Sequence, residues 1–277
     1  MVGQTQRPLN RLERELPEGV LVDAAWLRDH GYSRQLLSHY VKTGWLQQPA
    51  RGVYRRPRGS LSWQQLVVSL QTFLKFPAVV GGRTALELHG YAHYLPQKER
   101  EIHLYGPKSL PSWVNNLRLD SRFKSHNEQR LFHKHSVASE MDRLAHSPDA
   151  KESLGLSLTA MPLGQWDWKL ILSTPERAIL ELLDELPAHE TFHQADMLMH
   201  GLANLSPRRL QSMLADCNSI KVKRLFFFFA DRHAHAWLKS LKKEKFDLGT
   251  GKRLLVKGGK LDQAYQITVP EDLNGVR

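Results

Sequence analysis

The sequence contains a single cysteine, Cys217, among its 277 residues. One thiol cannot form a disulfide framework, and it excludes zinc sites built from several thiolates. This cysteine usage is typical of the reducing cytoplasm, where we expect the protein to act. Cys217 follows an apolar helical stretch and has no activating base beside it in the sequence. We therefore expect a buried, unreactive thiol rather than a nucleophile.

Long hydrophobic runs are also missing. The longest unbroken apolar run covers residues 225–230, which is far shorter than the ~20 residues needed to cross a bilayer. Residues 1–16 are polar and lack the apolar core of a secretory signal. These absences predict a protein that has no membrane partner and is not secreted.

Acidic residues are outnumbered by basic ones. The chain has 28 Asp and Glu against 39 Lys and Arg, which gives a formal net charge of +11. Such a balance favours polyanionic partners, because Lys and Arg release the counterions condensed on phosphates. The excess is greatest in residues 220–260, which we interpret either as a solvated face or as a second surface for DNA or RNA. Its candidate residues are Lys221, Lys223, Arg224, Lys242, Lys243, Lys252, Arg253 and Lys257.

The first sixty residues have the pattern of two short helices followed by a hairpin. Residues 20–28 have apolar residues at helical spacing, and Gly31 is placed to end that helix. Ser33 is a suitable N-cap for a second helix over residues 34–43. One face of this second helix is apolar. The opposite face carries polar and basic residues without any acid, namely Arg34, Gln35, Ser38, His39 and Lys42.

A basic hairpin is expected directly after this second helix. Trp45 and Leu46 should pack back on the helices, and Gly52 lies between two strand-like segments. Three arginines, Arg51, Arg55 and Arg56, accompany the predicted hairpin. Together these elements predict a winged helix-turn-helix over residues 1–59, in which Ser33 and the polar helix face read base edges and the arginines hold phosphates. A winged helix that contacts only proteins is the alternative.

Residues 60–277 mix helical and strand-like patterns, so the expected fold class is α+β: an N-terminal winged helix-turn-helix followed by a mixed α/β C-terminal region. We expect this region to divide into two subdomains near residues 158–173. The polar stretch over residues 142–157 matches no recognisable pattern, and its role stays open. Thr174 and Pro175 should begin a helix, as N-cap and first helical residue.

The histidines give only weak indications of a metal site. His89 and His93 are four residues apart on a helical pattern but lack the glutamate of a metalloprotease motif. His133 and His135 alternate on a possible strand with His126 nearby, and exposed polar histidines are the simpler interpretation. We expect neither a metal nor another cofactor.

Other catalytic motifs are absent or incomplete. The GTGK of residues 249–252 does not have phosphate-loop spacing, and Gly258-Gly259 predicts a hairpin turn instead. A metal-dependent nuclease targeted by the winged helix is the enzymatic alternative, since such nucleases hold Mg²⁺ with clustered carboxylates. Its candidates do not form a recognisable motif: Glu87, Glu99, Glu101 and Asp120. The sequence therefore predicts a protein that is not an enzyme.

Five segments in order along the chain resemble the AbiEi family, the antitoxin and transcriptional-regulator component of type IV abortive-infection toxin–antitoxin systems. They are GYSRQLLSHYVKTGWLQQPARGVYRRP (31–57), GGRTALELHGYAHYL (81–95), STPERAILELLDELP (173–187), IKVKRLFFFFADRHAHAW (220–237) and LGTGKRLLVKGGKLDQAYQITVP (248–270). No single segment is specific, but their order over most of the chain is.

The resemblance implies two activities on two modules. The N-terminal module would repress its own operon by binding inverted repeats in promoter DNA. The C-terminal region, residues 60–277, would be an antitoxin domain that counteracts a nucleotidyltransferase toxin without a stable toxin complex, as part of phage defence. An antitoxin that binds its toxin directly is the alternative.

Overall fold

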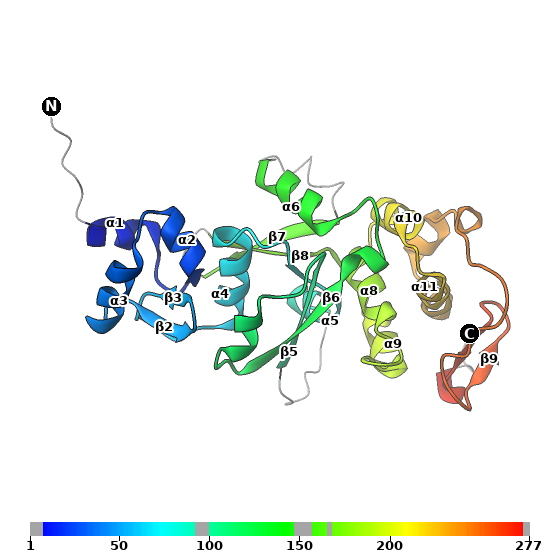
Figure 1. The fold of residues 1–277 in the computed structure, drawn as a ribbon. Coiled ribbons are helices and arrows are strands. Elements are labelled where there is room, and N and C mark those ends of the chain that lie inside the picture. Colours follow the sequence, from blue (N-terminus) through cyan, green and yellow to red (C-terminus); the bar gives the residue numbers. More distant parts are fainter. Residues whose placement is uncertain (1–7, 92–99, 147–156, 165–167, 274–277) are drawn as a thin grey trace.

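The computed structural model describes residues 8–91, 100–146, 157–164 and 168–273. The described chain combines helices with three separate sheets, which confirms the expected α+β class in this general form. In Figure 1 the N-terminal elements lie at one end, the largest sheet is central, and helices cover the other end.

The N-terminal region contains three helices and a small three-stranded sheet. The elements follow in the order α1 (Pro8–Glu15), β1 (Val22–Asp23), α2 (Ala24–Asp29), α3 (Arg34–Lys42), β2 (Gln47–Ala50) and β3 (Val53–Arg55). The sheet order is β1-β3-β2 with antiparallel pairing. The side chain of Asp23 caps α2, and that of Ser33 caps α3, so both helices begin where a polar side chain accepts a backbone N–H.

The central sheet has five strands in the order β6-β5-β4-β8-β7. Its strands are β4 (Val79–Val80), β5 (Arg100–Gly106), β6 (Ser121–Asn127), β7 (Leu158–Leu163) and β8 (Trp168–Ser173). The β5–β6 and β4–β8 pairs are parallel, and the other two pairs are antiparallel. Three helices accompany the sheet in sequence: α4 (Trp63–Val68), which continues into a π-helix over Ser69–Phe73, α5 (Gly82–Leu88) and α6 (Val137–His146).

Four helices follow the sheet: α8 (Pro175–Asp184), α9 (Phe192–Gly201), α10 (Pro207–Asp216) and α11 (Ile220–His233). Pro175 is the first residue of α8, as predicted. The four consecutive phenylalanines of α11 are all buried, and the largest hydrophobic cluster joins them to α8, α9 and the sheet. Two short antiparallel strands, β9 (Lys260–Asp262) and β10 (Ile267–Val269), follow near the C-terminal end of the described chain.

One guanidinium is completely enclosed in the C-terminal region. Arg177 of α8 has no exposed surface, and it donates to Glu128 at 2.8 Å and to Glu181 at 2.7 Å. It also donates to the carbonyl of His135 at 2.7 Å. These bonds tie α8 to the segment between β6 and α6.

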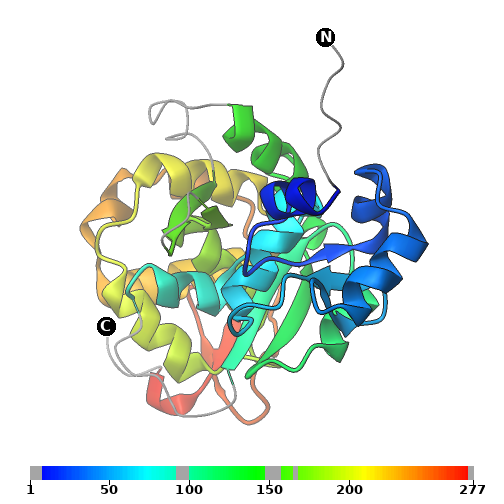
Figure 2. The same ribbon diagram turned by 90° about the vertical axis from the view of Figure 1, so that its left-hand side faces the viewer.

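The N-terminal region is packed against the rest of the chain. A hydrophobic cluster joins Leu21, Ala50 and Val53 to Leu66 and Leu70 of the α4 segment. The buried hydroxyl of Ser69 also accepts a hydrogen bond from the backbone N–H of Leu21 at 2.8 Å. Figure 2 shows the N-terminal elements against one side of the sheet-containing body. A boundary at residue 59 therefore cuts the chain between segments that share a core.

The subdomain break expected near residues 158–173 is wrong. Most of these residues form the antiparallel strands β7 and β8, which lie side by side in the central sheet. Buried residues of β8 belong to the same hydrophobic cluster as the helices that follow it. Within the described residues, the core is thus continuous across the expected break. Of the unmatched stretch 142–157, residues 147–156 lie outside the described residues, and Ser157 is buried and bonded to Glu140.

The hairpin predicted around Gly258-Gly259 lies elsewhere. These glycines precede β9, and the hairpin that pairs β9 with β10 turns at residues 263–266. The described chain contains no helix that is long and apolar enough to span a membrane.

Candidate nucleic-acid interface

One face of α3 presents all the polar residues that the sequence predicted there. The buried residues Leu37 and Tyr40 fix the opposite face against the N-terminal core. Six side chains are consequently exposed: Ser33, Arg34, Gln35, Ser38, His39 and Lys42. No acidic residue occurs in α3, so the face is basic along its whole length.

Arg51 lies at the turn between β2 and β3. The turn is tight, and Gly52 adopts a positive φ of 75°, a conformation that glycine adopts without a steric penalty. The Arg51 side chain is exposed, and within the described residues it has neither an ion pair nor a hydrogen bond. Its guanidinium is therefore free to bind an external anion.

Arg55 and Arg56 are not placed like Arg51. Arg55 is only 6% exposed, and its guanidinium donates to the carbonyls of Arg56 at 3.1 Å, Arg58 at 3.0 Å and Gly59. Burial lowers the pKa of Arg55. The expectation that Arg55 contacts DNA is corrected here, because its donors already hold the loop that follows β3. The strand period gives the reason, since Arg55 lies two residues after the buried Val53 and so faces the same way.

Arg56 is half-buried between two carboxylates. Its Nη2 atom lies 3.5 Å from Glu13 and 3.1 Å from Glu18. These ion pairs connect β3 to α1 and to the segment before β1, so Arg56 is not a free phosphate ligand. Arg58 is more exposed, although it also approaches Glu18 at 3.2 Å.

Sequence reasoning missed Trp45 as a surface residue. We expected Trp45 to pack back on the helices, but its side chain is 46% exposed while the adjacent Leu46 is buried. Gln47 and Gln48 on β2 are exposed as well. Trp45 and Leu46 lie in the bend before β2, so neither helix nor strand periodicity signalled the exposure of Trp45.

The second basic segment is only partly a surface. Lys223 and Arg224 are buried, and Arg224 donates to the carbonyls of Leu248, Gly251 and Gln266. Lys221 and Lys243 are held by internal carboxylates or carbonyls. Lys221, Arg224 and Lys243 are engaged by neighbouring segments of the chain, and Lys223 is buried in α11, so the prediction that these four residues form a surface is corrected. Four of the eight residues remain exposed: Lys242, Lys252, Arg253 and Lys257.

Three of the histidines considered for metal binding, His89, His126 and His135, contact other groups of the protein. A ring nitrogen of His89 lies 2.9 Å from the carbonyl of Ser173, and His135 contacts Glu140 at 2.7 Å. His93 lies outside the described residues. Across the described ranges, no group of three or more His, Cys, Asp or Glu residues has a geometry that could hold a metal ion.

The remaining catalytic candidates are also accounted for. Cys217 is buried as predicted, and burial raises the pKa of its thiol to about 11. Of the nuclease carboxylates, Glu87 and Glu101 approach Arg83 at 3.8 and 3.9 Å, Asp120 is exposed, and Glu99 lies outside the described residues. The exposed basic face of α3, followed along the chain by the free arginine of the β2–β3 turn, is the feature that points to an external ligand.

Two family models match the chain. Residues 5–97 match a model described as a transcriptional regulator, AbiEi antitoxin N-terminal domain. Residues 99–270 match one described as a transcriptional regulator, AbiEi antitoxin, of a type IV toxin–antitoxin system. The chain belongs to the AbiEi family. It is accordingly a transcriptional-regulator antitoxin of a type IV system, and AbiEi membership implies DNA and a toxin as its general partners.

A solved structure shares the AbiEi chain's fold. The crystal structure of the RV2827C protein from Mycobacterium tuberculosis aligns with a TM-score of 0.54 and 16% sequence identity. The alignment covers 94% of this chain and 89% of that one, so the likeness extends over both regions. No curated protein sequence matches the chain significantly.

Proposed function

We propose that residues 1–59 are a winged helix-turn-helix that binds duplex promoter DNA, and that the protein thereby represses its own operon. The observation that carries the proposal is the acid-free exposed face of α3 together with the unpaired Arg51 at the β2–β3 turn. The element order supports it, because two capped helices are followed by a two-stranded hairpin in the manner of a recognition helix and a wing.

The proposal divides the contacts into two kinds. Gln35, Ser38 and His39 carry short polar groups that suit base edges in the major groove, with Ser33 and Arg34 at the helix start. Arg51 and Lys42 supply charge for phosphates, which fix the position of the helix without carrying sequence information. The four exposed cations of the second basic segment, Lys242, Lys252, Arg253 and Lys257, would add further backbone contacts.

The C-terminal region from residue 60 onwards is proposed to carry the antitoxin activity. In this proposal it counteracts a nucleotidyltransferase toxin without a stable complex, in the cytoplasm and as part of phage defence. The protein has no catalytic activity of its own in this scheme and needs no cofactor. Operator sites would be inverted repeats, since such repeats suit two copies of one DNA-binding module.

The test is a fluorescence-anisotropy titration with the DNA immediately upstream of the gene and with a scrambled duplex, at two salt concentrations. Replacing Gln35 by Ala is expected to reduce the preference for the upstream DNA, because a base contact is lost, at a cost of about 1–3 kcal/mol. Replacing Arg51 by Ala is expected to weaken binding to both duplexes equally and to lower the salt slope by about one.

Arg143→Ala is the matched control, because Arg143 is an exposed arginine on α6, outside the N-terminal module. It should leave affinity and salt slope unchanged. Equal losses on both duplexes for Gln35→Ala and Arg51→Ala would refute the division of roles. Weak binding without preference would refute the operator proposal. Co-elution of the protein with its toxin in gel filtration would refute neutralisation without a stable complex and would support an antitoxin that binds its toxin directly.

A further inference from the structure

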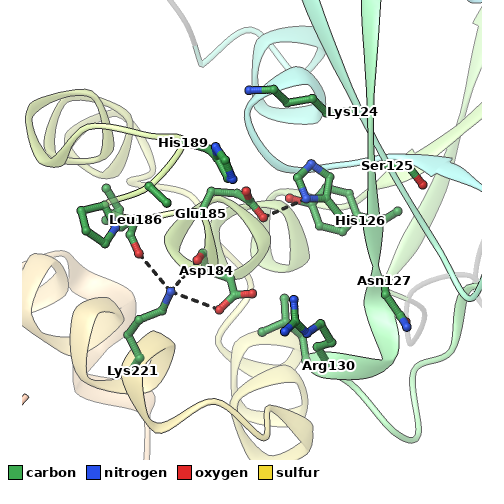
Figure 3. A pocket seen from close by; sticks show the side chains of 14 residues that line it. Lys124, Ser125, His126, Asn127, Arg130, Asp184, Glu185, Leu186, His189 and Lys221 are labelled. Carbon is green, nitrogen blue, oxygen red and sulfur yellow. Dashed lines mark hydrogen bonds and ion pairs between the residues drawn. The ribbon is translucent and has the colours of Figure 1, made fainter. Parts of the chain in front are cut away.

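A cavity of 670 Å³ lies in the C-terminal region, away from α3. It opens where β6 and the 3₁₀ turn Glu128–Arg130 face the end of α8 and the start of α11. Figure 3 shows Arg130 and Asn127 on one side, and Asp184 with Lys221 on the other. The cavity thus lies beyond the carboxyl ends of the parallel strands β5 and β6, where open α/β sheets commonly bind ligands.

Most charges at this cavity are neutralised by protein partners. Lys221 lies 3.3 Å from Asp184 and also donates to the carbonyls of Asp184 and Leu186. His126 contacts Glu185 at 2.9 Å. Burial raises the pKa of Glu185, but the hydrogen bond and charge of His126 outweigh it, so the net shift is downwards and the carboxylate stays ionised. The two carboxylates lining the cavity therefore already have cationic or N–H partners.

Lys124 is neutralised in the same way, since its Nζ atom lies 2.9 Å from Glu101. Arg130 is the exception. Its side chain is exposed and has no ion pair or hydrogen bond among the described residues. The cavity consequently contains one uncompensated positive charge, carried by a guanidinium whose planar donors suit an oxyanion.

Further polar groups line the cavity without converging on Arg130, since Ser125 alternates with Lys124 and His126 along β6 and Figure 3 shows His189 across the cavity from Arg130. The side chains of Ser125 and His189 make no hydrogen bond within the described chain. The carboxamide oxygen of Asn127 accepts from the backbone N–H of Gln129 at 3.0 Å, which leaves the amide N–H groups available. The cavity thus has several donor groups without a partner, whereas both of its carboxylates already have one.

A series of buried polar side chains fixes the position of His126 in the cavity wall. Nδ1–H of His126 donates to the ionised Glu185 at 2.9 Å, and Nε2 of His126 lies 3.1 Å from Nδ1 of His103, so that one of these two nitrogens donates to the other. Nε2 of His103 lies 3.9 Å from the buried Glu190, and neither that nitrogen nor the Glu190 carboxylate has a hydrogen bond. Tyr105 stacks on His126 with ring centroids 4.5 Å apart. His126 is therefore held in one orientation at the cavity wall.

We propose that this cavity binds the phosphate of a small phosphorylated molecule, with Arg130 as the ligand. A phosphate monoester carries about −1.5 to −2 charges near neutral pH, so an unpaired guanidinium attracts it more strongly than it attracts the single charge of a carboxylate. The volume lies within the range of about 300–1,000 Å³ found for small-molecule sites. The site is separate from the proposed DNA interface and does not depend on it.

The test is isothermal titration of the full chain with inorganic phosphate and pyrophosphate, at constant ionic strength in chloride, with acetate as the carboxylate probe. Saturable 1:1 binding of phosphate or pyrophosphate without measurable acetate binding is the expected result. Arg130→Gln should weaken that binding about tenfold or more, as expected for the loss of a charged hydrogen bond. Arg130 is exposed, so the variant should keep the wild-type melting curve.

Two control variants separate this site from other basic surfaces. Arg143→Gln removes an exposed arginine on α6, and Arg34→Gln removes one from the proposed DNA-binding face. Both should leave phosphate affinity unchanged. Three outcomes would overturn the proposal: equal binding of acetate, wild-type phosphate affinity in Arg130→Gln, or loss of binding in Arg34→Gln.

Discussion

Glu190 shows at the scale of a single residue how burial changes acid–base behaviour. Its carboxylate is 3% exposed and lacks hydrogen bonds, although Arg83 approaches it at 3.3 Å. Burial raises the pKa of Glu190 from an ordinary value of 4.5 to about 7. Between these two values the folded protein holds a proton that the unfolded chain has released. Stability should therefore fall as pH rises from 4.5 to 7 and stay lower above that range.

Replacing Glu190 by Gln should remove this pH dependence, because Gln resembles the protonated carboxyl. The variant is expected to gain more unfolding free energy, relative to wild type, at pH 8 than at pH 5. Urea unfolding at both pH values measures the difference. Glu244→Gln, at an exposed position, is the control. An equal effect of Glu190→Gln at the two pH values would contradict the assignment.

Arg51 and Arg55 show what residue patterns can and cannot predict. Composition and position suggested the same role for both, and the turn at Gly52 correctly placed Arg51 outside. Arg55 is enclosed because three carbonyls of the following loop converge on it. That convergence depends on the path of residues 56–59, which no local pattern encodes. The cavity around Arg130 was missed for a similar reason, since its residues come from four separate segments.

At the scale of elements, the start of α5 depends on Gly82. Gly82 has a φ of +52°, and its N–H donates to the carboxylate of Glu181 at 2.9 Å. A Cβ atom at Gly82 would lie 2.9 Å from the Tyr105 hydroxyl. Gly82→Ala should therefore cost more than the about 1–2 kcal/mol of left-handed backbone strain, because Tyr105 must also move.

Gly90→Ala provides the comparison, since Gly90 has a φ of +84° with open space around it. The Gly90→Ala variant should lose only the unfolding free energy that corresponds to left-handed backbone strain. The unfolding free energies of the two variants in urea measure the difference. Equal losses of unfolding free energy in the two variants would show that Tyr105 moves away from the new Cβ atom without a loss of stability.

Elements with strong local signals were predicted well. The Ser33 cap of α3 and Pro175 at the start of α8 both follow from short-range rules. The β9–β10 hairpin was misplaced because Gly258-Gly259 looks like a two-residue turn, whereas the pairing that decides the hairpin joins Lys260–Asp262 to Ile267–Val269. Strand pairing is a non-local property, and so is the order of the five-stranded sheet.

At the scale of the whole molecule, the shared core between the N-terminal region and α4 predicts joint unfolding. Leu21 and Val53 are fully buried against Leu66. Heating should give one transition whether it is followed in the N-terminal region or in the central sheet. Leu66→Ala should lower the stability of the whole chain by about 2–5 kcal/mol.

Calorimetry with tryptophan fluorescence and circular dichroism checks this expectation. Leu254→Ala is the control, because Leu254 is 74% exposed and should be nearly neutral. Two separate transitions in the wild-type chain would mean that the regions unfold independently.

The hydrogen bond from Leu21 to Ser69 and the cluster around Leu66 and Leu70 also bear on how such regulators can be recombined. Consider a chimaera in which residues 1–59 are replaced by the corresponding segment of another regulator. In this chimaera, non-native residues would pack against α4. Joining after Phe76 would carry α4 and its π-helical continuation with the segment and keep their contacts to Leu21, Ala50 and Val53. Under the proposed assignment of the DNA interface, exchanging that interface between regulators therefore requires a junction beyond the β2–β3 hairpin.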